Sequence, residues 1–136
     1  MNYWLVKSEP FKYSWDDFVK QGTGTWDGVR NYQARNNLAA MKLNDLVLFY
    51  HSNEGVEVVG IAKIVKEAYP DPTIDDKRWV VVDLMPVEKL PKTVTLQSIK
   101  ADERLQDISL IRQSRLSVQQ LKKEEFDIIL SKAYEV

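Results

Sequence analysis

The chain contains no cysteine, and His51 is the only histidine among its 136 residues. The absence of cysteine excludes a disulfide framework, a thiolate metal site and a cysteine nucleophile. The five glycines form no phosphate-binding loop, and no His-x-x-x-His or Asp-x-Asp-Gly pattern occurs. The segment 71–76 comes nearest to a hard-metal loop, but it lacks the ligand spacing and the bidentate Glu of calcium sites. We therefore expect no metal and no cofactor.

Long apolar runs are also missing. Lys7, Glu9 and Lys12 interrupt the apolar residues of the N-terminal segment, which suits neither a signal peptide nor a transmembrane span. We expect a soluble, intracellular protein with no membrane partner, cytoplasmic in general and nuclear if the host is a eukaryote.

Neither sign of charge dominates, because nineteen basic residues oppose twenty acidic ones. This balance argues against a broad cationic surface that would bind any duplex through counterion release. The distribution is uneven, since residues 112–123 contain Arg112, Arg115, Lys122 and Lys123 and no carboxylate. This segment is either a local basic edge or a solvated helix face whose charges serve solubility.

The chain is long enough for one core, and 44% of its residues are hydrophobic. It shows no repeat, low-complexity segment or Gly/Ser linker, so we expect one domain over residues 1–136. Apolar, β-prone segments at 3–6, 46–51, 56–69 and 78–90 predict strands, with Pro86 and Pro91 at weak or edge positions. Helical spacing predicts helices at about 14–20 and 31–41. We expect an α/β (α+β) fold: a small mixed β-barrel of about five to six strands with flanking helices.

Two capping patterns predict where helices begin. Ser14 precedes an acidic first turn, with Tyr13 placed to pack on Phe18. In RLSVQQL, Ser117 has the position of an N-cap and Gln120 that of its capping-box partner, so a C-terminal helix is predicted to start there. The apolar residues from 118 to 133 would pack that helix on the barrel.

The run WDGVRNYQARNNL, residues 26–38, combines two aromatic rings, two arginines and four amide side chains. A planar, hydrogen-bonding ligand such as a nucleobase needs both flat faces and directional donors and acceptors. Trp26 has few apolar neighbours in sequence, so we expect its ring to project from a loop, free to stack on a base. Trp4, Trp15 and Trp79 stand in apolar surroundings and are expected in the core.

Five segments, YWLVKSEP (3–10), the run at 26–38, DLVLFYHS (45–52), EAYPDPT (67–73) and SRLSV (114–118), follow one another in an order that resembles the EVE domain family. The resemblance covers Tyr3 to about Lys132. EVE domains are PUA-like β-barrels related to the YTH readers of methylated RNA, and they are associated with modified bases in nucleic acid. The resemblance therefore implies a single PUA-like barrel that reads a nucleobase.

The resemblance also implies roles for individual residues. Lys7 and Ser8 match the polar strand end beside the YTH pocket, and Trp26 matches the first tryptophan of the YTH cage. Asn31 matches the pocket Asn. The second cage tryptophan has no counterpart, and Tyr69, or Pro70 and Pro72, would form that wall. The residues expected to contact the base are Lys7, Ser8, Glu9, Trp26, Arg30, Asn31, Tyr32, His51, Tyr69, Thr73 and Ser117. Arg35 and Arg115 are expected to bind phosphate. Arg115 belongs to the Ser-Arg step that matches the contact of YTH domains with the nucleic-acid backbone.

We expect a non-catalytic, monomeric module that binds DNA or RNA with a modified base. Any reaction on the nucleic acid would be carried out by a partner nuclease or modification enzyme. One alternative is an enzyme acting on a nucleotide or a small planar metabolite, with Glu9 or His51 as acid or base. Nothing in the sequence points to a serine that His51 would serve. Another alternative is a protein-interaction module that uses the C-terminal helix.

Overall fold

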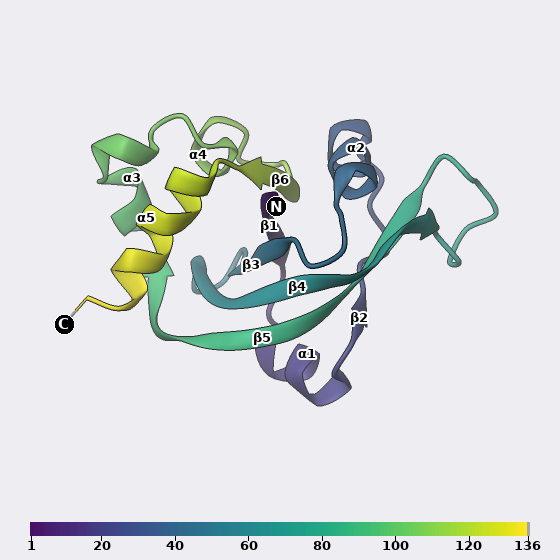
Figure 1. Ribbon diagram of the computed structural model, residues 1–136, viewed down its shortest axis with the longest axis horizontal. Helices are drawn as coiled ribbons and strands as arrows, with labels where there is room; N and C mark the ends of the chain where they lie inside the picture. The colour runs from purple at the N-terminus through teal and green to yellow at the C-terminus, as the bar shows by residue number, and fades with distance from the viewer. Residues whose placement is uncertain (136) are drawn as a thin grey trace.

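The computed structural model describes residues 1–135, which form one six-stranded mixed sheet with short helices around it (Figure 1). In Figure 1, α3, α4 and α5 gather at one end of the sheet, and the β4–β5 connection projects from the other end, beside α2. The elements in chain order are β1 (Tyr3–Ser8), α1 (Trp15–Gln21), β2 (Gly24–Thr25), α2 (Tyr32–Ala40), β3 (Leu46–His51), β4 (Glu57–Pro70), β5 (Val80–Thr95), α3 (Leu96–Lys100), a 3-10 turn at Glu103–Leu105, α4 (Ser109–Arg112), β6 (Val118–Leu121) and α5 (Lys123–Ala133).

The strands lie in the order β2-β5-β4-β3-β1-β6. β1 runs parallel to β3, from Tyr3 opposite Leu46 to Ser8 opposite His51, and every other pair is antiparallel. The mixed α/β fold expected from the strand and helix patterns is therefore confirmed. Pro86 and Pro91 lie on β5 beyond its short pairing with β2, which involves only Asp83 and Leu84, so both prolines occupy edge positions as predicted.

The sheet is not closed by hydrogen bonds, so the expected small mixed barrel is an open one. Within residues 1–135, β2 and β6 form the two ends of the sheet and do not pair. Helix α2 contacts both β5 and β6, and Asn37 Nδ2 donates to the Val118 carbonyl at 2.7 Å. β2 has two residues and β6 has four, so neither edge strand offers a long row of unpaired backbone groups. Helix α2 packs between the two edges.

Each face of the sheet carries its own apolar cluster, because side chains alternate along a strand. On β1, Trp4 and Val6 join the cluster that covers α1 and α2, whereas Leu5 joins the cluster on the other face with α5. The predictions that Trp4, Trp15 and Trp79 are core residues are confirmed, since all three side chains are buried.

The C-terminal helix does not begin at Ser117, contrary to the capping pattern. Residues Val118–Leu121 form β6, which pairs antiparallel with β1 and satisfies its open edge. Helix α5 begins at Lys123, and the Lys122 N–H donates to the Glu125 carboxylate at 2.8 Å. A local cap signal contributes about 1 kcal/mol, so the long-range pairing with β1 outweighs it. Phe126, Ile129 and Ala133 of α5 are buried, as expected of its apolar side.

The cap predicted at Ser14 is present. Ser14 accepts a hydrogen bond from the Asp17 N–H, the Asp17 carboxylate accepts one from the Ser14 N–H, and the Tyr13 ring lies 6.1 Å from that of Phe18. Asn31 caps α2.

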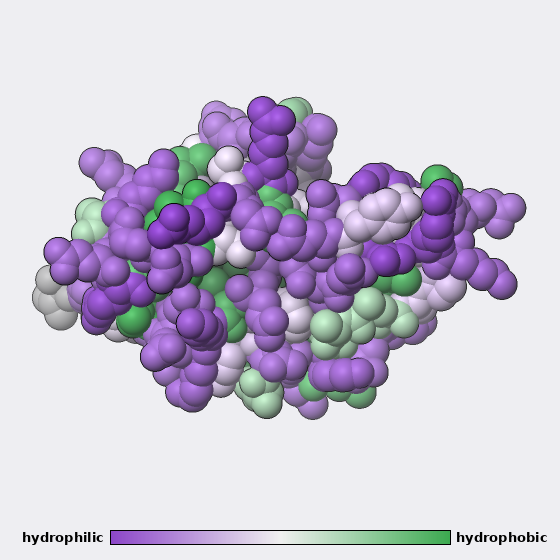
Figure 2. Space-filling view, turned by 90° about the horizontal axis from the view of Figure 1, so that it is seen from above, coloured by the Kyte–Doolittle hydropathy of each residue, from purple (hydrophilic) through white to green (hydrophobic). Residues whose placement is uncertain are grey.

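The face seen in Figure 2 is mainly hydrophilic, with hydrophobic side chains in small separate patches. None of the helices within residues 1–135 is long and apolar enough to cross a membrane.

Candidate nucleic-acid interface

A cleft of about 540 Å³ lies where the end of β1 meets the loop after β2. We call it the Trp26 cleft. Four of the residues predicted at the base, Lys7, Ser8, Glu9 and Trp26, line it together, although eighteen positions separate Ser8 from Trp26. The other lining residues, which sequence reasoning missed, are Lys12, Tyr13, Gln21, Thr25 and Asp27. Their only signal in the sequence is proximity to the segments at 7–9 and 26.

Trp26 is more deeply buried than its sequence surroundings predict. Its side chain is only 8% exposed, and its ring meets those of Phe49 and Tyr13 edge-on at centroid distances of 5.7 and 6.1 Å. The Trp26 N–H donates to the Val82 carbonyl at 2.9 Å, which continues the β2–β5 edge. The apolar partners come from distant segments, so neighbours in sequence gave no sign of them. Trp26 therefore forms a fixed wall of the cleft, and the expectation of a freely projecting ring is wrong.

Polar groups of both kinds surround this wall. The Ser8 hydroxyl donates to the Tyr13 carbonyl, and the Tyr13 hydroxyl donates to Gln21. Glu9 pairs with Lys12 at 3.2 Å, and Asp27 presents an exposed carboxylate. Burial lowers the pKa of the Lys7 ammonium, and burial followed by the Asp17 charge raises the pKa of Tyr13. The cleft thus combines an aromatic wall with hydrogen-bond donors and acceptors.

Asp71 fixes the loop that carries Trp26. Its carboxylate is fully buried and accepts hydrogen bonds from the Gly28 N–H at 3.1 Å, from Arg30 at 3.0 Å and from the Thr73 N–H at 2.8 Å. Burial by itself would raise the pKa of Asp71, but the hydrogen bonds from Thr73, Arg30 and Gly28 outweigh it and hold the pKa at about 2. Gly28 has a φ of 73°, a backbone conformation that favours glycine. The start of the β4–β5 connection is therefore tied to the loop after Trp26.

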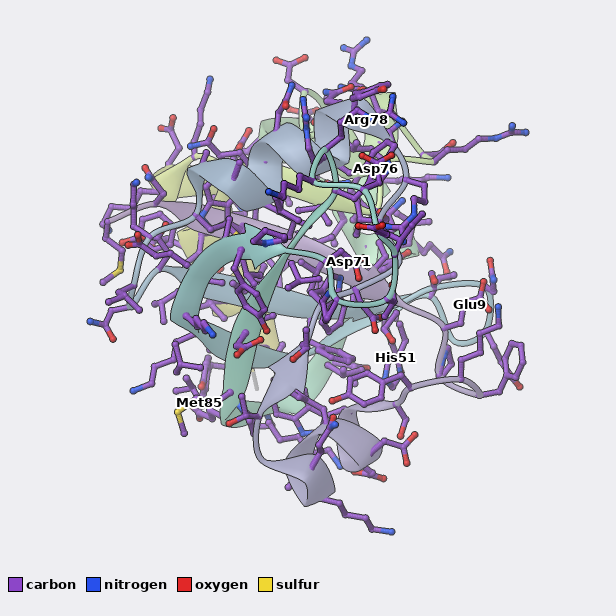
Figure 3. The ribbon with its side chains drawn as sticks, turned by 90° about the vertical axis from the view of Figure 1, so that its right-hand side faces the viewer. Glu9, His51, Asp71, Asp76, Arg78 and Met85 are labelled. Carbon is purple, nitrogen blue, oxygen red and sulfur yellow. The ribbon has the colours of Figure 1, made fainter. Side chains whose placement is uncertain are left out.

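An arginine-aromatic cluster covers the side of the molecule beside this connection. The rings of Tyr32 and Trp79 stack at a centroid distance of 5.0 Å, with Arg30 over Trp79 at 5.6 Å and Arg35 over Tyr32 at 5.2 Å. Arg78 binds the Asp76 carboxylate with a closest distance of 2.6 Å, and Asp71, Asp76 and Arg78 follow one another along this side in Figure 3. Arg30, Tyr32, Arg35 and Thr73 thus gather near one another, but none of them lines the Trp26 cleft. Sequence reasoning missed Arg78, whose only signal is its place next to Trp79.

A second cleft, of about 510 Å³, adjoins the first at Lys7 and Glu9 and contains two further predicted residues, Arg115 and Ser117. We call it the Tyr50 cleft. Its remaining lining residues are Tyr50, Ser52, Asn53, Val56, Leu96, Leu110 and Ser114.

Asn31 lies apart from the Trp26 cleft. It lines a smaller hollow of about 320 Å³ with Gln33 and residues 112–116. Its side-chain oxygen accepts a hydrogen bond from the Ala34 N–H at 2.9 Å as the cap of α2. Arg115 borders both this hollow and the Tyr50 cleft. Asn31 and Trp26 therefore line different hollows, because α2 holds the Asn31 side chain at its first turn.

Tyr69 and His51 also lie outside the clefts. The Tyr69 hydroxyl donates to Asp83 at 2.6 Å, and Lys66 lies 4.1 Å from the ring centre. Tyr69 is not among the residues that line the Trp26 cleft, although Thr25, which does line it, donates to the same Asp83 carboxylate. His51 Nε2 accepts a hydrogen bond from the Trp15 N–H at 3.1 Å. Burial lowers the pKa of His51, although the charges of Glu57 and Asp16 partly oppose this. His51 is a neutral acceptor that holds the start of α1 against the end of β3.

Residues 2–132 match the EVE domain family. The chain belongs to the EVE domain family. It is 43% identical to thymocyte nuclear protein 1 of Mus musculus, over 96% of this chain and 73% of the mouse protein. It is 38% identical to the human protein of that name over the same shares.

Solved structures agree with the fold. A protein from Agrobacterium tumefaciens superimposes with a TM-score of 0.97 at 45% identity, covering 98% of this chain and 94% of that one. Human THYN1, crystallised in complex with DNA containing 5-methylcytosine, gives a TM-score of 0.95 at 37% identity, covering 100% of this chain and 99% of the human one. The YTH domain of Zygosaccharomyces rouxii MRB1, in complex with N6-methyladenosine RNA, shares the fold at a TM-score of 0.58 and 14% identity, covering 99% of this chain and 88% of that one. The predicted EVE membership and its relation to the YTH fold are confirmed.

Proposed function

We propose that this EVE domain binds nucleic acid by taking one nucleobase into the Trp26 cleft, that it prefers a modified base, and that it performs no chemistry of its own. The observation that carries this proposal is the assembly of Lys7, Ser8, Glu9 and Trp26 around one cleft of about 540 Å³. Small-molecule sites of ~300–1,000 Å³ are typical, so a single base fits the space. The crystal complex of the human relative with 5-methylcytosine DNA supports the same class of ligand.

Each part of the cleft has a distinct task in this proposal. A base that leaves its stack meets the Trp26 ring, and stacking on an aromatic contributes about 1–3 kcal/mol. Its edge then meets the polar groups. Cytosine presents an exocyclic amino group that a carboxylate accepts, and the exposed Asp27 carboxylate lies beside Trp26 for that purpose. Thymine presents no such donor at that position, so Asp27 favours cytosine-type bases over it.

Two contacts bear on the choice between binding and catalysis. His51, the candidate base of an enzyme, already accepts the Trp15 N–H at its Nε2 atom. Glu9, the candidate acid, is paired with Lys12 at 3.2 Å. A general base must reach the proton that it removes with a free lone pair. His51 therefore has no free lone pair for that role, whereas Glu9 keeps free oxygen lone pairs and the nearby Lys12 only offsets its charge.

The test is a binding screen with oligonucleotides of one sequence that carry cytosine, 5-methylcytosine or another modified base at a single position, as DNA and as RNA. We expect at least one modified oligonucleotide to bind more tightly than its unmodified counterpart. Equal affinity for every modified and unmodified oligonucleotide, or no binding at all, would overturn the proposal.

A matched pair of variants connects the preference to the cleft. Asp27→Asn changes an exposed carboxylate of the cleft, and Asp75→Asn changes an exposed carboxylate of the β4–β5 connection that does not line the cleft. We expect Asp27→Asn to reduce the discrimination between cytosine-type and thymine-type bases, and Asp75→Asn to leave it unchanged. The same discrimination in both variants would remove Asp27 from the recognition step.

A further inference from the structure

The Tyr50 cleft is separated from the Trp26 cleft only by the end of β1. Lys7 and Glu9 line both clefts, so the two spaces share a wall. Their volumes, about 510 and 540 Å³, are nearly equal. Leu96, Leu110 and Val56 give the Tyr50 cleft apolar surface. A second flat group of similar size, next to the one in the Trp26 cleft, would find both room and apolar contact there.

Tyr50 gives this cleft a hydrogen-bonding group that the protein itself does not use. Its side chain is only 3% exposed, yet within residues 1–135 its hydroxyl has no hydrogen-bond partner and is not among the fully enclosed polar atoms. The hydroxyl therefore opens into the cleft that the residue lines. Burial raises the pKa of Tyr50 to about 12, so the hydroxyl keeps its proton near neutral pH. A hydroxyl inside a narrow cleft gains free energy when it forms a hydrogen bond, and an acceptor atom on a ligand would be its partner.

The shared wall carries a positive charge in the right place. The Lys7 ammonium donates to the Ser114 carbonyl at 2.6 Å, and the Lys7 N–H donates to the Ser117 carbonyl at 2.9 Å, so both ends of the residue are fixed. Burial lowers the pKa of this ammonium, and a nearby anion would offset that cost. Glu9 on the same wall would repel an anion, but its carboxylate is paired with Lys12. Arg115 adds a second cation at the rim of the Tyr50 cleft.

We propose that the Tyr50 cleft is a subsite for the nucleotide adjacent to the one held in the Trp26 cleft. The phosphate that joins the two nucleotides lies over Lys7, and the Tyr50 hydroxyl donates to an acceptor on the second base. This inference rests on the proposed function and extends it from one base to a two-nucleotide step. It gives the protein a preference for sequence context at one side of the recognised base.

The test combines a change in the ligand with a change in the protein. The ligand is the oligonucleotide with the preferred modified base from the screen above, made with a normal base or an abasic residue at the position 5′ or 3′ of it. The protein is wild type or Tyr50→Phe, which removes the hydroxyl and keeps the ring in the core. Tyr134→Phe is the control, because its exposed hydroxyl bonds Glu88 on another part of the molecule.

We expect the abasic residue on one side only to weaken wild-type binding by roughly five- to hundredfold, the range for loss of one stacked base. Tyr50→Phe should weaken binding of the normal oligonucleotide by roughly two- to tenfold and leave binding of that abasic oligonucleotide unchanged. Tyr134→Phe should match wild type throughout.

Two results overturn the inference while the proposed function stands. One is tight, modification-dependent binding that neither abasic residue weakens. The other is a Tyr50→Phe loss that is equal with and without the flanking base. If no modified oligonucleotide binds preferentially, the proposed function fails and the two-nucleotide step fails with it.

Discussion

Replacing Asp71 with Asn should loosen the loop that carries Trp26 and destabilise the whole protein. One carboxylate oxygen of Asp71 accepts from Gly28 and Arg30, and the other accepts from the Thr73 N–H and hydroxyl. An Asn side chain keeps one acceptor oxygen and turns an NH₂ group toward two donors. The side chain is fully buried, so water cannot replace the lost bonds. Because Arg30 is partly exposed, the main cost is that of buried donors left without an acceptor, about 1–3 kcal/mol each, and we expect a loss of about 2–4 kcal/mol.

Urea denaturation measures the free energy of unfolding of wild type, Asp71→Asn and Asp76→Asn. Asp76 also binds an arginine, but its carboxylate and the Arg78 side chain are both partly exposed, so Asp76→Asn should cost much less. We further expect Asp71→Asn to weaken binding of the modified oligonucleotide, because the Trp26 wall loses its support. Equal unfolding free energies for the two variants would refute the idea that Asp71 holds the loop.

The pH dependence follows from the lowered pKa of Asp71. A carboxyl group whose folded pKa is about 2 binds its proton more weakly than in the unfolded chain, where the ordinary value is 3.8. Its contribution to stability is therefore complete above about pH 4 and is lost as the pH falls toward 2, an effect of about 2 kcal/mol. The stability difference between wild type and Asp71→Asn should shrink over this interval. A difference that stays constant from pH 5 to about pH 2 would contradict the assigned cause.

Three further predictions follow from the packing and charges of the interface. Trp26→Ala should lower the free energy of unfolding by about 3–5 kcal/mol, because the ring is buried against Phe49 and Tyr13; chemical denaturation measures this, and an unchanged midpoint would argue that the ring is dispensable for the core. Arg115→Ala should weaken modified and unmodified oligonucleotides alike and reduce the slope of log affinity against log salt by about one, and a changed base preference in a salt titration would speak against a phosphate contact. Purified protein should neither hydrolyse nor deaminate nucleotides beyond background, and turnover that disappears in Glu9→Gln would favour an enzyme.

Much of this protein could be predicted from the sequence because the deciding signals are local. The strands at β1, β3, β4 and β5 follow from apolar, β-prone runs, and α1 follows from the Ser14 cap. The segments that resemble the EVE family also brought Lys7, Ser8, Glu9 and Trp26 to one expected site, and the structure places them around one cleft.

Tertiary structure decided the features whose partners are distant in the chain. Residues 118–121 carry a helix-start pattern but form β6, because the open edge of β1 offers main-chain partners that a helix would leave unpaired. Trp26 is buried by Phe49 and Tyr13, neither of which is its neighbour in sequence. The remaining predicted site residues lie in different places, because different elements hold them: Arg115 and Ser117 in the Tyr50 cleft before β6, Asn31 at the start of α2, and Arg30, Tyr32, Arg35 and Thr73 in the arginine-aromatic cluster. Tyr69 and His51 contact Asp83 and the start of α1 instead. Local sequence encodes which groups are available, and the long-range pairing of short edge strands determines which of them can face one ligand.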